Sequence, residues 1–517
     1  MKNILFIDAS LYCNPVSIKE SLKPLGNNKR NSFEETVKRT VPLKDRFDSL
    51  ILFCSEDFPE DEKIKFKDYG FKIMTGKHSN IIELLKTCKN VCKDFDNLVL
   101  VYADSPCLDT EIFKNLIELH LKSGAEYTFA DNLPEGFAPE IMSIDFLEDI
   151  ILASLKFPEL VSRKIFDNTN ADINRYFAEV FLPDEDISLF RLNLHTDTPR
   201  NTLLIQRLFE KSSDVNFKTV CSLLKTDPSI FRIWPRYVEI EITNDQGLNP
   251  PLYLPTSTRP VKMMDFKLFQ KICYELAEFM PDVICSFSGI GEPLLHQNLI
   301  DMLEFGVNSS GIFSFILETD GIYLDQKKAE RLSSLPPKSF QVIFRVDAIK
   351  PETYSYIRNK ANLSVVLENI QRFLSLNPEN KNRTFVQFVK LRENLEEMEE
   401  FWRFWTSQNV GVIIQKFNDY AGKFKPELKV ADLSPLNRTF CWHMSRDLTI
   451  LADGRVPVCR QDFDGFKTVG NLVSDSISSV WKKLEPYYIE NYYNKWNNDN
   501  SLNPLCEFCD EWYVFNF

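Results

Sequence analysis

The segment Ile450-Leu451-Ala452-Asp453-Gly454-Arg455-Val456-Pro457-Val458-Cys459 carries a turn and a cysteine, and it decides the fold of the C-terminal part of the chain. Its Asp-Gly pair is typical of a tight hairpin turn, which predicts that Cys459 lies at a strand end. Cys441 precedes this segment, and Cys506-Glu507-Phe508-Cys509 follows it. A Cys-x-x-Cys spacing lets two thiolates reach one metal from a tight turn. Together these four cysteines predict a metal site.

The residues alone leave the nature of this metal site open. Thiolate ligands suit a [4Fe–4S] cluster or a tetrahedral zinc ion, and unligated structural cysteines are the third interpretation. A metal would also account for the stability of so short a module. His443 is a further candidate ligand, although a packed histidine explains it more simply. The other eight cysteines mostly lie in apolar segments and are interpreted as small buried residues, not as a disulfide framework.

The order and spacing of these residues resemble the SPASM domains of radical-SAM maturases. The resemblance covers residues 437–517 and includes Val469-Gly470-Asn471-Leu472 and Val480-Trp481. It implies that an auxiliary iron–sulfur cluster is held by Cys441, Cys459, Cys506 and Cys509, so it favours iron over zinc. The commonest longer variant of the domain carries additional cysteines, which this sequence lacks. The resemblance therefore implies one [4Fe–4S] cluster.

A long alternation of strand and helix patterns precedes this module. The repeat is about 30 residues long, which predicts parallel strands joined by right-handed crossovers. The expected strands are Tyr237–Ile242, Asp282–Phe287, Ser314–Glu318, Gln341–Asp347, Thr384–Val389 and Val410–Gln415, and the expected helices include Asp265–Phe279, Leu363–Leu374 and Leu395–Trp405. Units of this kind, repeated six times, predict a partial (β/α)6 barrel.

This region resembles a radical-SAM barrel. Its segment Gly289-Ile290-Gly291-Glu292-Pro293 looks like the family's Gly-Gly-Glu-Pro segment, which binds the methionine end of S-adenosylmethionine. The resemblance implies that the cofactor-binding residues are Gly289, Gly291, Glu292 and Pro293. From the residues alone, a Gly-x-Gly turn after a strand can bind a ligand through bare backbone groups, or it can be only a tight turn.

The loop after the first barrel strand departs from the radical-SAM pattern. The family places a Cys-x-x-x-Cys-x-x-Cys motif there, and the aligned residues here are Gln246, Pro250 and Tyr253. None of them supplies a thiolate, and proline has no side-chain donor at all. We therefore expect no radical-generating cluster. Three hypotheses remain for the barrel: it still binds S-adenosylmethionine, it is a structural relic, or its missing cluster ligands come from elsewhere.

The first 216 residues form another α/β series. The expected strands are Asn3–Ile7, Ser49–Phe53 and Asn97–Tyr102, and the expected helices are Ser32–Thr40, Asn80–Cys92 and Thr110–Ser123. Asp104 follows the third of these strands, at the sheet edge where carboxylates are placed for ligand or metal binding, and Asp197 lies in a second acidic turn. These turns resemble those of cytidylyltransferase-type nucleotidyltransferases with a GT-A-like fold, which implies Mg²⁺ at Asp104 and Asp197. The glycine-rich nucleotide loop of that family is replaced by Asp8–Pro15.

The order of these regions predicts four parts. They are a nucleotidyltransferase-like domain (1–216), a helical linker (217–235), a radical-SAM-like barrel without cluster cysteines (236–432) and a SPASM domain (433–517). This order resembles the spiro-SPASM proteins. The first functional hypothesis is a non-radical binding or accessory maturation protein with an unknown peptide, protein or small-molecule ligand. The alternative is a Mg²⁺-dependent nucleotidyltransferase acting through the N-terminal domain.

Charge and hydropathy restrict the partners and the location. The formal net charge of −13 argues against nucleic acid as a partner. No apolar run approaches the roughly 18 residues of a membrane helix. The apolar run near Met1 ends at Asp8, too early for a signal peptide, so we expect a buried strand there and a cytoplasmic protein.

Overall fold

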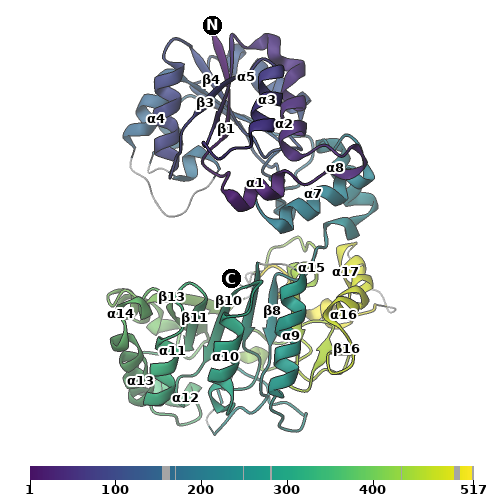
Figure 1. Cartoon of the computed structure of the whole chain (residues 1–517). Helices are drawn as coiled ribbons and strands as arrows, with labels where there is room; N and C mark the ends of the chain where they lie inside the picture. The colour runs from purple at the N-terminus through teal and green to yellow at the C-terminus, as the bar shows by residue number, and fades with distance from the viewer. Residues whose placement is uncertain are drawn as a thin grey trace. The chain divides into compact units, whose positions relative to one another are not determined.

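The computed structural model describes residues 1–153, 163–168, 171–248, 250–279, 282–431, 434–493 and 501–514. The chain divides into two compact units, Met1–Phe231 and Arg232–Phe517 (Figure 1). Each unit is built around its own seven-stranded sheet, and the fold class is α/β, as predicted. Within the described segments, no helix is both long enough and apolar enough to cross a membrane.

The sheet of the first unit has the strand order β3-β2-β1-β4-β6-β5-β7. Its strands are β1 (Asn3–Ala9), β2 (Ser49–Cys54), β3 (Lys72–Thr75), β4 (Asn97–Tyr102), β5 (Tyr127–Ala130), β6 (Glu140–Ser143) and β7 (Ala178–Phe181). Strands β1 to β4 are parallel, whereas β6 is antiparallel to β4 and β5. Every residue of β1 and β4 is buried, because helices cover both faces of the sheet (Figure 1).

The helices of this unit confirm the predicted pattern. They are α1 (Pro15–Ser21), α2 (Ser32–Thr40), α3 (Glu60–Asp68), α4 (Ile81–Cys92), α5 (Thr110–Ser123), α6 (Ile144–Leu152), α7 (Pro199–Lys211) and α8 (Phe217–Thr226). The start of α2 was predictable because Asn31 and Glu34 form a capping box, each side chain accepting the other's backbone N–H. Helix α8, predicted as a linker, belongs to the first unit, where Asp109 accepts the Phe217 N–H at 2.9 Å.

The second unit contains the predicted series of parallel strands. They are β8 (Tyr237–Ile240), β9 (Val283–Phe287), β10 (Ile312–Thr319), β11 (Phe340–Arg345), β12 (Thr384–Lys390) and β13 (Gly411–Lys416), hydrogen-bonded in that order. The intervening helices are α9 (Phe266–Phe279), α10 (Leu299–Val307), α11 (Gln326–Ser333), α12 (Pro351–Ile357), α13 (Leu363–Leu376) and α14 (Met398–Thr406), and they lie on the outer side of the curved sheet (Figure 1).

The segment after Cys441 corrects the predicted hairpin. Strand β14 (Asp447–Ile450) pairs in parallel with β8 and becomes the seventh strand of the barrel sheet. The turn that follows is present, with Gly454 at a φ of 84°. However, β15 (Arg455–Pro457) pairs antiparallel with β16 (Thr468–Asn471), not with β14. Without β14, the edge of β8 would present unpaired backbone groups. The strand that the sequence pattern assigned to the hairpin pairs with this edge instead.

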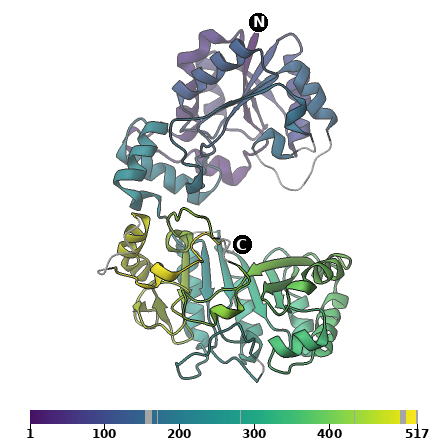
Figure 2. The ribbon, with the colours of Figure 1, turned by 180° about the vertical axis from the view of Figure 1, so that it is seen from behind.

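Short helices complete the C-terminal part of the second unit (Figure 2). They are α15 (Trp442–Arg446), α16 (Ile477–Lys483), α17 (Glu485–Tyr492) and α18 (Leu505–Phe508). An ion–aromatic contact and hydrogen bonds hold this part against the start of the barrel. Arg232 lies 3.6 Å from the ring centre of Trp481 and donates to its carbonyl oxygen at 2.9 Å. The Trp481 indole N–H donates in turn to the Ile233 carbonyl at 2.9 Å.

Candidate functional site

The four cysteines predicted to hold a metal line one cavity in the second unit. Cys441 caps the start of α15, and Cys459 follows β15. Cys506 lies in α18, and Cys509 ends that helix. Three separate segments of the chain, which carry Cys441, Cys459 and the pair Cys506 and Cys509, therefore bring their sulfur atoms to the same cavity.

Hydrogen-bond donors surround the sulfur atoms of this cavity. The Asn503 side-chain amide donates to Cys506 Sγ at 3.5 Å and to Cys459 Sγ at 3.8 Å. The Asn491 amide donates to Cys506 Sγ at 3.6 Å, and the Glu511 backbone N–H donates to Cys509 Sγ at 3.4 Å. Such donors favour sulfur atoms that carry negative charge, as thiolate ligands do.

The spacing of the sulfur atoms bears on the kind of metal. Among the described residues, no group of three cysteine, histidine or acidic side chains is close enough together to hold a single metal ion. A tetrahedral zinc ion, with Zn–S bonds of about 2.3 Å, needs its sulfur atoms within about 4 Å of one another. A cluster spreads its cysteine ligands over several iron atoms. Both kinds of site need the four thiolates to face one cavity, and the four cysteines line one.

Burial controls the protonation of these thiols. It raises the pKa of Cys506 to about 11 and that of Cys459 and Cys509 to about 12. Burial also raises the pKa of Cys441 well above its usual value. The metal-free thiols are therefore protonated at neutral pH, and a bound metal must displace those protons.

His443 is packed and hydrogen-bonded, in agreement with the simpler of the two interpretations. Its Nδ1 lies 2.5 Å from Asp447 Oδ2, and its Nε2 lies 3.2 Å from the Glu511 carbonyl oxygen. Both ring nitrogens are thus engaged, although the side chain lines the cysteine cavity.

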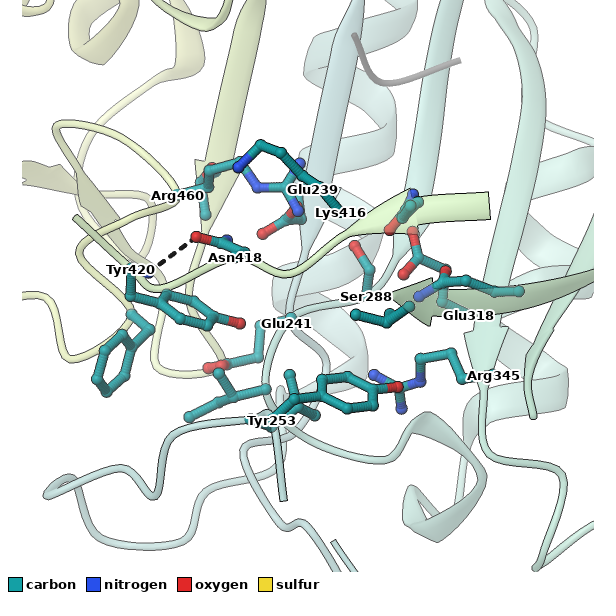
Figure 3. Close-up of a pocket in the computed structure, with 18 of the residues that line it drawn as sticks. Glu239, Glu241, Tyr253, Ser288, Glu318, Arg345, Lys416, Asn418, Tyr420 and Arg460 are labelled. Atoms are coloured by element: carbon teal, nitrogen blue, oxygen red, sulfur yellow. Dashed lines mark hydrogen bonds and ion pairs between the residues drawn. The ribbon is translucent and has the colours of Figure 1, made fainter. Parts of the chain in front are cut away.

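A second and larger cavity lies inside the barrel (Figure 3). It is lined by residues at or near the carboxyl ends of the barrel strands, where parallel sheets place their ligand sites. Of the predicted cofactor-binding residues, Gly289 lines this cavity, and Gly291, Glu292 and Pro293 do not. Arg460 lines both the barrel cavity and the cysteine cavity, so the two are neighbours.

Glu292 makes its hydrogen bonds within the protein. Its side chain is buried and accepts hydrogen bonds from the Leu294 N–H at 2.9 Å, the Thr319 hydroxyl at 2.5 Å and the Asp320 N–H at 2.8 Å. Arg345 adds a weak ion pair at 3.4 Å. This carboxylate is therefore already occupied by protein donors.

Gly291 has a packing role at the same turn. A Cβ atom at this position would lie 1.9 Å from the Thr243 carbonyl oxygen, so only glycine allows the turn to approach the loop after β8 this closely. Such an approach requires glycine whether or not a ligand binds nearby.

The residues that replace the cluster cysteines make internal contacts. The Tyr253 hydroxyl is buried and donates to Asp347 Oδ2 at 2.7 Å. Arg358 pairs with the same carboxylate and with Asp320 at 2.6 Å. Gln246 donates to the Pro255 carbonyl at 2.9 Å. Tyr253 is thus one member of a buried network of charges at the end of the barrel.

In the first unit, the two aspartates predicted to bind Mg²⁺ both accept hydrogen bonds from one arginine. Arg163 donates to both carboxylate oxygens of Asp104, at 3.0 and 2.8 Å, and to Asp197 at 3.2 Å. Its guanidinium also lies 4.1 Å from the ring centre of Tyr12. His195 Nδ1 is 3.2 Å from Asp104. The guanidinium thus neutralises the pair that the sequence pattern assigned to a metal ion.

The electrostatics of Asp104 follow from this contact. Burial alone would raise the pKa of Asp104, but Arg163 and His195 outweigh it and hold the pKa well below its usual value. Asp104 is therefore a carboxylate at neutral pH. Arg163 was missed in the sequence because a single basic residue distant from Asp104 gives no motif. The indirect signal in the sequence was a pair of acidic turns, at Asp104 and Asp197, without a glycine-rich loop.

A third cavity lies next to this ion pair. Its lining includes Tyr102, Ser105, Glu140, Arg163 and His195, so it combines hydroxyl, acidic and basic groups at the end of β4. The arrangement can bind a polar ligand beside the Asp104–Arg163 pair.

Comparison with known proteins supports the assignment of the C-terminal part. Residues 441–510 match SPASM, an iron-sulfur cluster-binding domain. An uncharacterized protein of Treponema pallidum (strain Nichols) is 27% identical over 368 residues, which cover 68% of this chain and 98% of that protein. The spore coat polysaccharide biosynthesis protein SpsF of Bacillus subtilis (strain 168) is 23% identical over 239 residues, covering 44% of this chain and 96% of SpsF.

Among solved structures, the crystal structure of BtrN in complex with AdoMet and 2-DOIA resembles this chain with a TM-score of 0.38 and 17% identity. The alignment covers 53% of this chain and 92% of BtrN.

Proposed function

We propose that this protein binds one auxiliary [4Fe–4S] cluster through Cys441, Cys459, Cys506 and Cys509, and that its barrel binds a ligand without generating radicals. In this role it would be a cytoplasmic binding or accessory maturation protein for a peptide, protein or small molecule. The observation that carries the proposal is the convergence of the four cysteines on one cavity within residues that match an iron-sulfur domain.

The residues of the chain have distinct parts in this proposal. A bound [4Fe–4S] cluster supplies one-electron transfer. The four thiolates hold it, and the amide groups of Asn491 and Asn503 donate hydrogen bonds to the sulfur atoms of Cys459 and Cys506. Hydrogen bonds of this kind stabilise the reduced, more negative state. The buried aromatic side chains of Tyr488 and Trp512, which pack with Cys441, limit access of water.

The first barrel loop supports the non-radical part of the proposal. Gln246, Pro250 and Tyr253 supply no thiolate, and the Tyr253 hydroxyl donates to Asp347. Glu292, the expected partner of the methionine end of S-adenosylmethionine, already accepts protein N–H and O–H donors.

Anaerobic reconstitution tests this function. We expect about four iron and four sulfide per chain by metal analysis, with an EPR signal of a reduced [4Fe–4S] cluster, both lost in the Cys506→Ala/Cys509→Ala double variant. Cys273→Ala is the matched control, since that buried cysteine lies in α9 and does not line the cysteine cavity. Stoichiometric zinc without iron would overturn the cluster. Formation of 5′-deoxyadenosine from S-adenosylmethionine and reductant would overturn the non-radical barrel.

The nucleotidyltransferase activity is a second candidate function. The convergence of Asp104 and Asp197 beside a polar cavity favours it, as does the similarity to SpsF over 239 residues. Mg²⁺ is bound by one or two carboxylates plus waters and phosphates, but here Arg163 would have to leave the pair first. Calorimetry with CTP tests this: binding that requires Mg²⁺ and is lost in Asp104→Asn supports the activity, and no binding with Mg²⁺ present excludes it.

A further inference from the structure

The polar groups of the barrel cavity are only partly satisfied by the protein. The Ser288 hydroxyl is buried at the end of β9 and has no hydrogen-bond partner among the described residues. The side chain of Glu318, on the neighbouring strand β10, has no hydrogen bond or ion pair within the described part of the chain either. Figure 3 places both side chains at the cavity, with Tyr420 on its other side. Buried polar groups are normally paired, so the buried Ser288 hydroxyl points to a ligand, and the carboxylate of Glu318 lines the same cavity.

The charges of the cavity single out Glu318. The carboxylate of Glu241 accepts two hydrogen bonds from Arg259, at 2.7 and 2.8 Å. Glu239 lies 3.7 Å from Arg460. The basic residues of the cavity are likewise paired, since Arg345 lies 3.0 Å from Asp320 and Lys416 lies 2.9 Å from Asp510. Glu318 is thus the cavity carboxylate that no described cation neutralises within 4 Å.

A carboxylate in such a place favours a cationic ligand. Burial raises the pKa of Glu318 although the charges of Arg345 and Arg460 act in the opposite direction, so the carboxylate remains unfavourable there. A water molecule can donate hydrogen bonds to this carboxylate but carries no charge. An ammonium group donates hydrogen bonds and also carries the positive charge that neutralises the carboxylate. The cavity volume of about 90 Å³ limits the enclosed part of the ligand to a small group.

The rest of the lining indicates what else the ligand carries. Neutral groups that both donate and accept hydrogen bonds line the same cavity as Glu318: the amides of Gln387, Gln415 and Asn418 and the hydroxyl of Tyr420. Hydroxyl groups of a ligand match such amides and hydroxyls, because each can donate and accept at once.

We propose that the barrel cavity binds a small polyhydroxylated amine, such as an amino sugar, whose ammonium group pairs with Glu318 and whose hydroxyl groups bind Ser288 and the cavity amides. This inference rests on the proposed function, since it names the ligand class of a barrel that does not generate radicals. No covalent step is involved.

Calorimetry on the anaerobically reconstituted full chain tests the proposal, with D-glucosamine as the probe and D-glucose as its uncharged counterpart. We expect glucosamine to bind at least tenfold more tightly than glucose. Glu318→Gln keeps the shape of the side chain and should remove this preference. Glu399→Gln, at a side chain that is 74% exposed, is the control and should keep it.

Each other outcome has a definite meaning. No binding of glucosamine, equal binding of glucose, or an unchanged preference in Glu318→Gln would overturn the inference. S-adenosylmethionine binding that depends on Glu318 and excludes glucosamine would also overturn it. The proposed function fails by a different result, the formation of 5′-deoxyadenosine. Circular dichroism of Glu318→Gln shows whether the variant is folded, and if it is not, Ser288→Ala takes its place and should weaken glucosamine binding.

Discussion

Replacing Arg163 with methionine should destabilise the first unit by about 3–5 kcal/mol, the usual cost of removing one partner from a buried ion pair. Asp104 is 1% exposed and Arg163 is 7% exposed, so neither group regains hydration when its partner is lost. Asp197, whose side chain is 23% exposed, is partly hydrated and contributes less. Most of the expected loss of stability therefore comes from the buried charge of Asp104, which no longer has a partner.

The dependence on pH follows from the direction of the pKa shift. Arg163 and His195 hold the folded pKa of Asp104 below its unfolded value of about 3.9. The ion pair therefore stabilises the wild type fully above about pH 4, and this contribution is lost as pH falls toward the folded pKa. In Arg163→Met, burial acts on Asp104 with less opposition and raises its pKa, so protonation on acidification relieves the cost. The stability difference between the two proteins should narrow from pH 7 to pH 4.

Thermal denaturation followed by circular dichroism measures this difference. For a unit of this size, a loss of 3–5 kcal/mol corresponds to a Tm lower by about 6–20 °C. Arg46→Met is the matched control, because Arg46 is exposed and pairs with Glu118 at 3.3 Å, an interaction worth less than about 1 kcal/mol. An unchanged Tm in Arg163→Met at pH 7, or a difference that does not change with pH, would refute the reasoning.

Further predictions concern the other described sites. Asn503→Leu should lower the reduction potential of the cluster in a redox titration, because two N–H donors to sulfur are lost; an unchanged potential would show that Asn503 does not act on the cluster. Tyr253→Phe should cost about 1–3 kcal/mol in urea denaturation, because Asp347 loses a buried donor, and a neutral effect would contradict that role. His120 has a pKa lowered to about 4 by burial, so stability should fall as pH drops from about 6.5 to 4 while the unfolded state takes up a proton. His120→Gln should flatten that pH profile, and an equal slope in both proteins would contradict the assignment.

Local signals in the sequence were enough to predict strands β8 to β13 of the barrel and several of the helices. The helices Ser32–Thr40 and Thr110–Ser123 begin at Asn31 and Asp109, whose side chains accept backbone N–H groups of the first turn. The parallel strands of the barrel were predictable because they are short apolar runs separated by helical patterns. The four C-terminal cysteines were predicted to share a site, and they line one cavity.

Contacts between distant segments could not be predicted from the sequence. Arg163 meets Asp104 across 59 residues and Asp197 across 34, and no local pattern links them. Strands β8 and β14 lie at opposite ends of the barrel segment in the sequence, so no local pattern predicts that they pair. The Asp-Gly turn favoured a hairpin instead. Likewise, Glu292 matches a known motif. The motif does not show that Thr319 and Asp320 already donate hydrogen bonds to the Glu292 carboxylate.

Strand β14 links the edge of the barrel sheet to the C-terminal cysteine-bearing part of the chain. Without β14, the outer edge of β8 would present a row of unpaired N–H and C=O groups, the kind of surface on which separate chains aggregate. The same short strand is followed, through a tight turn and β15, by Cys459, a proposed cluster ligand. Oxidative loss of the cluster would therefore loosen a segment whose other end shields the barrel from intermolecular pairing. If the proposed cluster is bound, its loss would therefore be expected to expose the edge of β8 as well as the four cysteines.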